Sequence, residues 1–192
     1  MTEVLSLDRY MVRRKVMKLF GGAFHVYDDE EQIVAFSEMK AFKLKEDIRV
    51  FDGEDKKTEL LTIKARKILD FSSAYDVVDA RTGERVGALK RKGLKSILRD
   101  QWIVMDADDR DIASIDEDSM LLALIRRLIT PIIPQTYIVT MQDRRVAEMK
   151  QNWNPFVYKL NVQYDSVTDT TLDRRLGLAA ALLLAAIEGK QN

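Results

Sequence analysis

Hydrophobic and polar positions alternate along most of the chain in a pattern that recurs five times. Each copy has a short β-rich strand, a polar turn that contains aspartate, and a second strand with Val, Ile or Leu. Alternation on both sides of a polar turn is typical of a β-hairpin, and the clearest turn signals are Asp52-Gly53 and Thr82-Gly83. The pattern therefore predicts at least ten strands. The five copies occupy residues 24–36, 48–63, 75–89, 102–115 and 137–149.

The arrangement of these hairpins favours a closed sheet. The copies start at irregular intervals, which is unlike the uniform repeats of a solenoid or a propeller. An open sheet of this many strands would leave two edges free to pair with other chains, whereas closure removes both edges. We therefore predict a mostly β fold, a closed antiparallel β-barrel of about 12 strands.

Two segments break the alternation and predict helices. Residues 118–130 start with acidic residues and end with arginines before Pro131, which fits a helix and its dipole. The second helix is predicted over about residues 171–188, with Thr170 and Asp173 in a capping pattern and Gly189 as the C-terminal cap.

The second helix is apolar on every side between residues 176 and 187. This run of twelve residues is shorter than the ~20 that a bilayer-spanning helix needs. A helix without a polar face must be surrounded by apolar matter, so we expect this alanine-rich helix to pass through the middle of the barrel. Because no segment has the composition of a linker, residues 1–192 are predicted to form a single domain.

Composition excludes several classes of function. The 31 basic and 31 acidic residues balance, so the overall charge favours neither nucleic acid nor an anionic membrane, and no nucleic-acid partner is expected. The absence of cysteine excludes disulfides, thiol catalysis and thiolate metal sites, and a single histidine excludes multi-histidine metal sites. The first 18 residues do not fit a secretory signal, which together with the lack of cysteine favours a cytoplasmic protein.

No pattern in the chain indicates catalysis. A G-x-S-x-G nucleophile elbow and the glycine-rich loops that bind phosphate are both absent. His25 alternates with Phe24 and Val26, which places it on the polar side of a strand, at the surface or next to a turn. We therefore expect a protein that is not an enzyme and needs no cofactor.

Basic residues concentrate in the stretch GALKRKGLKSILRD, at residues 87–100. A folded patch drawn from this stretch would bind phosphate headgroups, because each basic residue near an anionic surface adds about 1 kcal/mol. A solvated face interleaved with Asp and Glu is an equal alternative. The arginine pairs at 126–127 and 174–175 add to the candidate patch. The candidate headgroup-binding residues are Lys90, Arg91, Lys92, Lys95 and Arg99.

The densest acidic cluster spans residues 106–118. Asp106, Asp108 and Glu117 have the spacing of a calcium loop, since Ca²⁺ binds several hard oxygens and the twelfth position supplies a carboxylate. However, Arg110 stands at the fifth position, where a ligand is expected, and Asp111 replaces the glycine at the sixth. The alternative is a hairpin turn followed by the start of a helix.

The hairpins and the apolar terminal helix together resemble the phospholipid scramblase and LURP-one-related group, which shares a fold superfamily with the tubby C-terminal domain. The resemblance is most specific over residues 87–109, where Ile97 to Asp100 and Asp106 to Asp108 match the scramblase pattern. It implies a closed barrel around a central helix and a binding module without catalytic chemistry; phosphoinositide recognition is attested for tubby. The cysteine-rich segment that carries palmitate in animal scramblases is absent.

The scramblase pattern also implies that Asp106 and Asp108 bind calcium, with Glu117 as a further ligand. Because Arg110 and Asp111 depart from that pattern, we expect no more than weak, millimolar calcium binding.

Three functional hypotheses follow. The first is a cytoplasmic, non-enzymatic barrel that binds anionic phospholipid headgroups or another ligand at a membrane surface. The second is a lipid-translocating scramblase whose terminal helix leaves the barrel for the bilayer. The third is an intracellular interaction or regulatory module without a lipid role.

Overall fold

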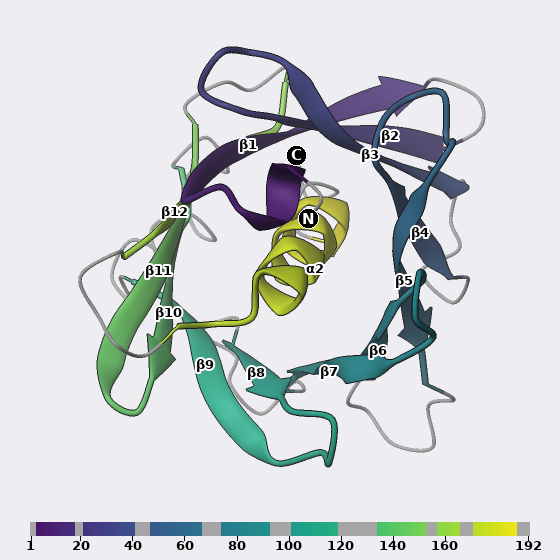
Figure 1. Ribbon diagram of the computed structural model, residues 1–192. Helices are drawn as coiled ribbons and strands as arrows, with labels where there is room; N and C mark the ends of the chain where they lie inside the picture. Colours follow the sequence, from purple (N-terminus) through teal and green to yellow (C-terminus); the bar gives the residue numbers. More distant parts are fainter. Residues whose placement is uncertain are drawn as a thin grey trace.

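The computed structural model describes residues 3–17, 21–40, 47–66, 74–92, 101–118, 134–152, 157–165 and 171–187. In this part of the chain, twelve strands form a closed barrel in which each strand pairs antiparallel with the next and β1 closes against β12 (Figure 1). The predicted closed antiparallel barrel of about 12 strands is confirmed. A short 3-10 helix, η1 (Glu3–Leu5), precedes the first strand. The strands are β1 (Arg9–Met17), β2 (Gly21–Tyr27), β3 (Ile33–Lys40), β4 (Ile48–Phe51), β5 (Glu59–Ala65), β6 (Ala74–Asp79), β7 (Arg85–Arg91), β8 (Gln101–Met105), β9 (Asp111–Glu117), β10 (Thr136–Met141), β11 (Arg144–Gln151) and β12 (Lys159–Tyr164).

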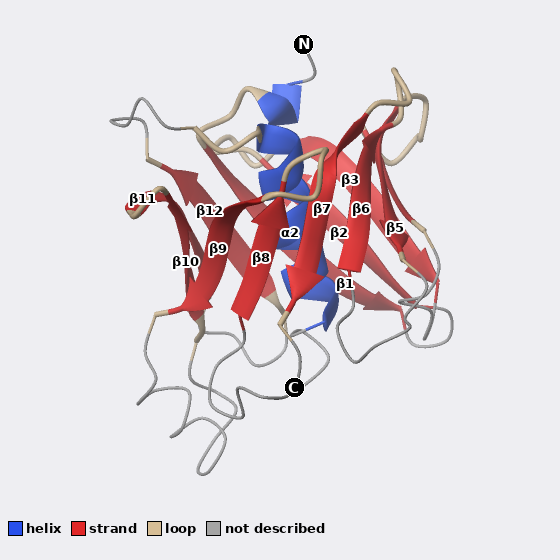
Figure 2. Ribbon diagram, turned by 90° about the horizontal axis from the view of Figure 1, so that it is seen from below, coloured by secondary structure: helices blue, strands red, loops and turns tan. Residues whose placement is uncertain are grey.

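The helix α2 (Arg174–Ile187) runs through the middle of the barrel, as predicted (Figures 1 and 2). Its residues from Leu176 to Ala186 are all buried, and it contacts β1, β5, β6, β7 and β12. The alanines keep the helix narrow enough for the wall to close around it, while the leucines fill the space on each side. None of the helices within the described ranges has the length and hydropathy that a membrane span requires.

The start of α2 differs from the prediction. The helix begins at Arg174, three residues later than expected, and Asp173 is at its N-cap, where its Oδ1 accepts a hydrogen bond from Arg175 N at 2.8 Å. Thr170, the other residue of the predicted capping pattern, lies outside the described residues. The predicted C-cap, Gly189, lies outside the described residues, as does the predicted helix after position 118. Asp118 itself still follows the sheet, since its N–H donates to the carbonyl of Thr136 at 2.9 Å.

The first turn of α2 packs tightly against the wall at Gly177. A Cβ atom there would overlap the hydroxyl oxygen of Tyr164 and lie 2.9 Å from its Cζ. Tyr164 is held in place from both sides: its hydroxyl lies 3.2 Å from that of Tyr10, and the Arg174 guanidinium stacks 3.6 Å from its ring centroid. The small residue at 177 therefore fixes how closely the helix approaches β1 and β12.

Five hairpin turns lie at the same end of the barrel, the end at which α2 begins, here called the turn end (Figure 2). An aspartate opens four of them, and its Oδ1 accepts a backbone hydrogen bond from the same turn. The aspartates of the sequence pattern are therefore turn-forming residues, Asp28, Asp52, Asp79 and Asp106. The five turns are residues 28–32, 52–58, 80–84, 106–110 and 142–143. The opposite end, where α2 finishes, is called the far end.

Candidate ligand-binding end of the barrel

The predicted basic stretch reaches the far end on β7, where the strand separates its three described basic residues. Lys90 and Lys92 are exposed on the outer face, and Lys90 pairs with Ile103 of β8. Arg91 pairs with the buried Trp102, so it faces the interior with Leu89 rather than joining the two lysines. Lys95 and Arg99 lie outside the described residues, as do Arg126 and Arg127.

Further lysines lie in the parts of their strands that are nearest the far end of the barrel. Four described lysines besides Lys90 and Lys92 occupy the last or first three positions of β1, β5, β11 and β12 at that end. Together these six residues are called the far-end lysines. The described acidic residues at the same level are equal in number, and the arginines Arg49, Arg66 and Arg91 add to the positive charge there. These acidic residues are Glu38, Asp47, Asp76, Asp116, Glu117 and Asp118. The far-end lysines are Lys15, Lys64, Lys90, Lys92, Lys150 and Lys159.

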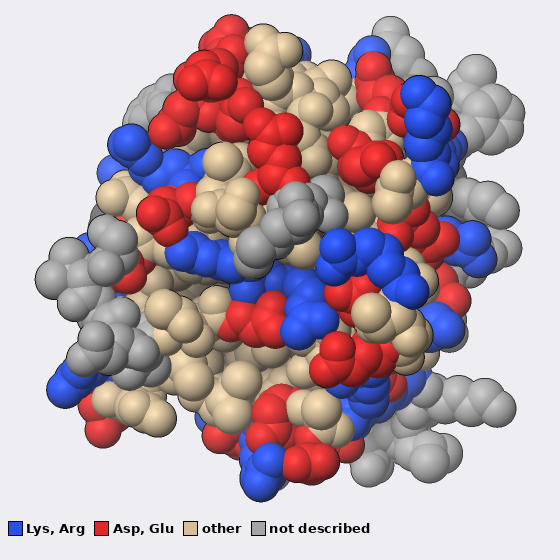
Figure 3. All heavy atoms as spheres, in the orientation of Figure 1, with Lys and Arg blue, Asp and Glu red and all other residues tan. Residues whose placement is uncertain are grey.

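The turn end has the opposite charge. The five turns contain twelve acidic residues and four basic ones, an excess of eight negative charges. Because the whole chain has 31 of each sign, the remaining residues carry an excess of eight positive charges. Figure 3, which looks onto the turn end, shows Asp and Glu side chains gathered at several points around its rim with Lys and Arg between them. The acidic residues are Asp28, Asp29, Glu30, Glu31, Asp52, Glu54, Asp55, Glu84, Asp106, Asp108, Asp109 and Asp143, and the basic ones are Lys56, Lys57, Arg81 and Arg110.

The structure brings two of the three candidate calcium ligands together and leaves the third apart. Asp106 and Asp108 both lie in the turn between β8 and β9, but Arg110 Nε donates to Asp106 Oδ2 at 2.8 Å and Arg110 Nη2 to Asp108 Oδ2. Glu117 lies at the other end of β9, about 20 Å along the strand, and its side chain faces the interior. Among the described residues, no group of three His, Cys, Asp or Glu side chains is placed to hold a metal ion.

The same turn is tied to the outer face of the barrel by a second ion network. Arg66 bridges Asp76 of β6 and Asp109 of the turn, at 2.7 and 2.5 Å, and Arg85 contacts the same two carboxylates. Hydrogen bonds from Arg66 and Arg85 lower the pKa of Asp109. The acidic residues of this turn thus neutralise arginines of the protein itself.

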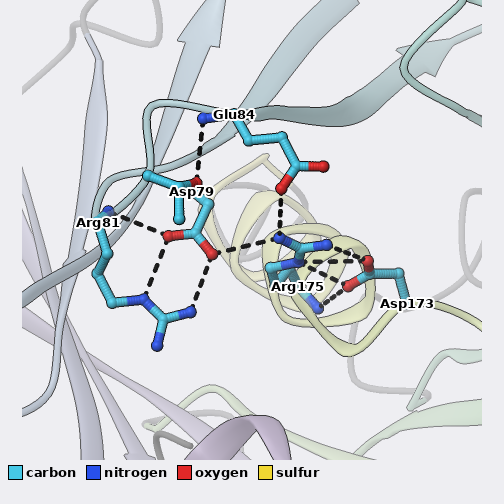
Figure 4. Close-up of polar contacts among 6 residues, drawn as sticks. Asp79, Arg81, Glu84, Asp173 and Arg175 are labelled. Carbon is cyan, nitrogen blue, oxygen red and sulfur yellow. Dashed lines mark hydrogen bonds and ion pairs between the residues drawn. The ribbon is translucent and has the colours of Figure 1, made fainter.

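A third network closes the turn end around the start of α2 (Figure 4). The side chain of Asp79 is 2% exposed, and its carboxylate accepts from Arg81 Nη2 at 2.9 Å and from Arg175 Nη1 at 3.2 Å. Arg175 also contacts Glu84 and Asp173. The hydrogen bonds from Arg81 and then Arg175 hold the pKa of Asp79 at about 2, so it is ionised at neutral pH. The Arg174-Arg175 pair therefore belongs to the turn end and does not extend the basic stretch.

His25 lies on the outer face, as its alternation with Phe24 predicts, but it is not exposed at the surface. The turn between β4 and β5 covers it: Glu54 Oε1 lies 2.7 Å from Nε2, and the ring packs edge-on against Phe36. Only 8% of the side chain is accessible. Strand alternation gives the face correctly but does not show that a turn from a later hairpin folds over it.

Sequence reasoning missed two features. Asp79 and Arg175 are 96 positions apart, and no local pattern joins them. Arg14 continues the inward alternation of Tyr10 and Val12, so its side chain lies on the interior face of β1. That alternation could have revealed the inward arginine.

The comparisons with known proteins identify a family. Residues 33–184 match the LURP-one-related family, a range that covers most of the barrel and most of α2. No curated protein and no solved structure matches the chain. The likeness to scramblases and to the tubby domain stays a prediction. The matched range spans well over half of the sequence, and the chain therefore belongs to the LURP-one-related family.

Proposed function

We propose that this LURP-one-related barrel is a non-enzymatic, cytoplasmic protein that binds anionic phospholipid headgroups at a membrane surface through its far end. The observation that carries the proposal is the separation of charge: an acidic turn end, and lysines at the far end that include Lys90 and Lys92.

Separation along the barrel matters because electrostatic attraction to a membrane acts over a short distance. β7 alone, with seven residues, separates its two ends by about 20 Å. The Debye length at physiological salt is about 8 Å, so acidic turns at that distance are screened from a surface that the lysines touch. A net charge of zero is thus compatible with electrostatic binding by one end. Each lysine near the surface contributes about 1 kcal/mol.

The packing of α2 supports binding over lipid translocation. A helix of 14 residues is about 21 Å long, whereas the hydrocarbon core is about 30 Å thick. Leaving the barrel would separate Arg175 from the buried Asp79 and withdraw eleven buried residues from the core. The energetic cost of these losses favours a helix that stays inside.

Vesicle flotation tests the proposal. The double variant Lys90→Ala/Lys92→Ala should bind vesicles of phosphatidylserine and phosphatidylcholine about 30-fold more weakly at low salt, because two lysines contribute about 2 kcal/mol. The control is Lys57→Ala/Arg144→Ala, which removes the same charge from exposed positions at the turn end and should bind like the wild type.

Added salt should weaken binding of the wild-type protein. Equal binding by the two double variants, or salt-independent binding to pure phosphatidylcholine, would contradict headgroup recognition by the far end. No binding to any vesicle would favour a regulatory module without a lipid role.

A further inference from the structure

The side chain of Arg14 brings a positive charge to the interior of the barrel, and two of its buried nitrogens make no hydrogen bond. Arg14 of β1 pairs with Phe24 of β2, which is fully buried in the core, and its neighbours on the same face are Tyr10 and Val12. Its backbone N–H donates to the carbonyl oxygen of Tyr158, just before β12, at 3.0 Å. Arg13 and Lys15 are exposed on the outer face. Arg14 is therefore the residue of this basic run that points inward.

Arg14 lies toward the far end of the interior. Tyr10, on the same strand, contacts Tyr164 beside the first turn of α2, and Arg14 is four residues, about 13 Å, further along. It is level with the start of β12, because its neighbour Arg13 pairs with Lys159, one of the far-end lysines. The charge is thus placed inside the same end that the proposed function turns toward a membrane.

Among the described residues, no carboxylate pairs with the guanidinium of Arg14, and its electrostatic neighbour is the phenol of Tyr158. Its Nε and Nη1 are buried and make no hydrogen bond. Desolvation lowers the pKa of Arg14, which reports the cost of holding a charge there. Arg174 also has a buried Nη1 without a hydrogen bond, but its Nη2 pairs with Asp8 and its guanidinium stacks on Tyr164. Arg175 contacts both Asp79 and Asp173.

An unpaired, partly buried charge is unfavourable for stability, by several kcal/mol when no partner is present. A methionine or leucine at this position would fill the space without that cost. The arginine therefore fits a partner that comes from outside the fold, and the guanidinium fork matches the oxygens of a phosphate or carboxylate in two parallel hydrogen bonds.

We propose that Arg14 anchors a binding site for a phosphate-bearing ligand inside the far end of the barrel. The choice of phosphate rests on the proposed function, because the surrounding far-end lysines favour a ligand of higher negative charge. Either a lipid headgroup or a soluble phosphomonoester supplies this chemistry. The ligand enters from the far end, since α2 and the Asp79 network occupy the turn end.

The test compares the wild type with Arg14→Met, which keeps the apolar stem and removes the charge. Glycerol 3-phosphate should raise the Tm of the wild type in a concentration-dependent manner at constant ionic strength, and should leave Arg14→Met unchanged. Without ligand, the Tm of Arg14→Met should equal or exceed that of the wild type, because a charge without a partner has been removed. Arg14→Lys keeps the charge without the fork and should respond more weakly.

Arg13→Met is the matched control, since Arg13 is the exposed neighbour on the same strand, and it should respond to glycerol 3-phosphate like the wild type. Three results would each overturn the proposal: no response of the wild type, an undiminished response of Arg14→Met, or a Tm of ligand-free Arg14→Met several degrees below that of Arg13→Met. The last result would mean that Arg14 stabilises the fold.

Flotation with vesicles of phosphatidic acid distinguishes the two sources of phosphate. Weaker binding by Arg14→Met identifies a lipid headgroup as the ligand, whereas unchanged binding together with a lost glycerol 3-phosphate response identifies a soluble ligand. If the wild type binds no anionic vesicle but responds to glycerol 3-phosphate, the proposed membrane function fails and the Arg14 site stands.

Discussion

Substituting Gly177 by alanine is the sharpest test of how α2 fits the barrel. In an unconstrained helix this change would stabilise by up to about 1 kcal/mol, because alanine has the higher helix propensity. Here the added Cβ would overlap the Tyr164 hydroxyl and lie 2.9 Å from Cζ and 3.1 Å from Cε1. The ring has to move, or the helix has to withdraw from the wall.

The cost follows from the contacts that Tyr164 would lose. Its hydrogen bond with Tyr10 contributes about 1 kcal/mol, and the stacking of Arg174 on its ring contributes about 0.5–1 kcal/mol. Overpacking adds about 1–3 kcal/mol. After subtraction of the helix-propensity gain of about 1 kcal/mol, Gly177→Ala should destabilise by about 1.5–4 kcal/mol, which lowers the Tm by roughly 3–16 °C in a domain of this size.

Urea unfolding of four proteins measures this effect: the wild type, Gly177→Ala, Tyr164→Phe and the double variant. Phenylalanine removes the hydroxyl that causes the closest overlap, so Gly177→Ala should cost less in the Tyr164→Phe background, with a coupling of at least about 0.5 kcal/mol. Gly53→Ala is the control, because a Cβ there meets Asp55 Oδ1 at an ordinary 3.6 Å. A Gly177→Ala protein as stable as the wild type, or an equal cost in both backgrounds, would refute this account of the packing.

Two further predictions concern the acidic residues of the turn end. The pKa of Asp79, lowered to about 2, lies below its unfolded value, so its stabilisation of about 2 kcal/mol is fully present above pH 4 and is lost as pH falls through about 2. Asp79→Asn should lower stability at pH 7 and flatten the pH dependence of urea unfolding between about pH 4 and 2, and parallel pH profiles would contradict this. Micromolar calcium should not change the Tm, because Arg110 already neutralises Asp106 and Asp108 and Glu117 is at the opposite end of β9. A micromolar calcium response that Asp106→Asn abolishes would show that calcium displaces Arg110.

Local information determines the hairpins and the central helix. Alternation assigns each strand its two faces, and an aspartate whose carboxylate accepts hydrogen bonds from the following backbone specifies the turn. Both effects act within a few residues, so the sequence is sufficient to predict them. The uniformly apolar run of α2 likewise requires an apolar surrounding on all sides, which a closed barrel provides. The capping pattern gives the start of the helix only to within a few residues, and the hydrogen bond from Arg175 N to Asp173 Oδ1 places it at Arg174.

Properties that depend on which strands become neighbours could not be predicted in this way. His25 is buried because a turn some 30 residues later covers it. Arg175 forms an ion pair because β6 places Asp79 at the turn end, beside the start of α2. The basic stretch reads as one patch along the chain, yet the period of two in β7 turns Arg91 inward and leaves Lys90 and Lys92 outside.

The equal numbers of acidic and basic residues in the sequence do not show that the two charges are separated along the barrel. Acidic residues are spread through the sequence in five separate turns, and only the antiparallel order of the closed barrel gathers those turns at one end. The alternation along β1 could have revealed Arg14 as an inward position, but whether an inward arginine has a hydrogen-bond partner depends on every element that lines the interior. The sequence by itself determined the elements and their faces, because these follow from short-range hydrogen bonding and side-chain periodicity. The tertiary structure decided where the charges meet, because that depends on contacts between residues far apart in the chain.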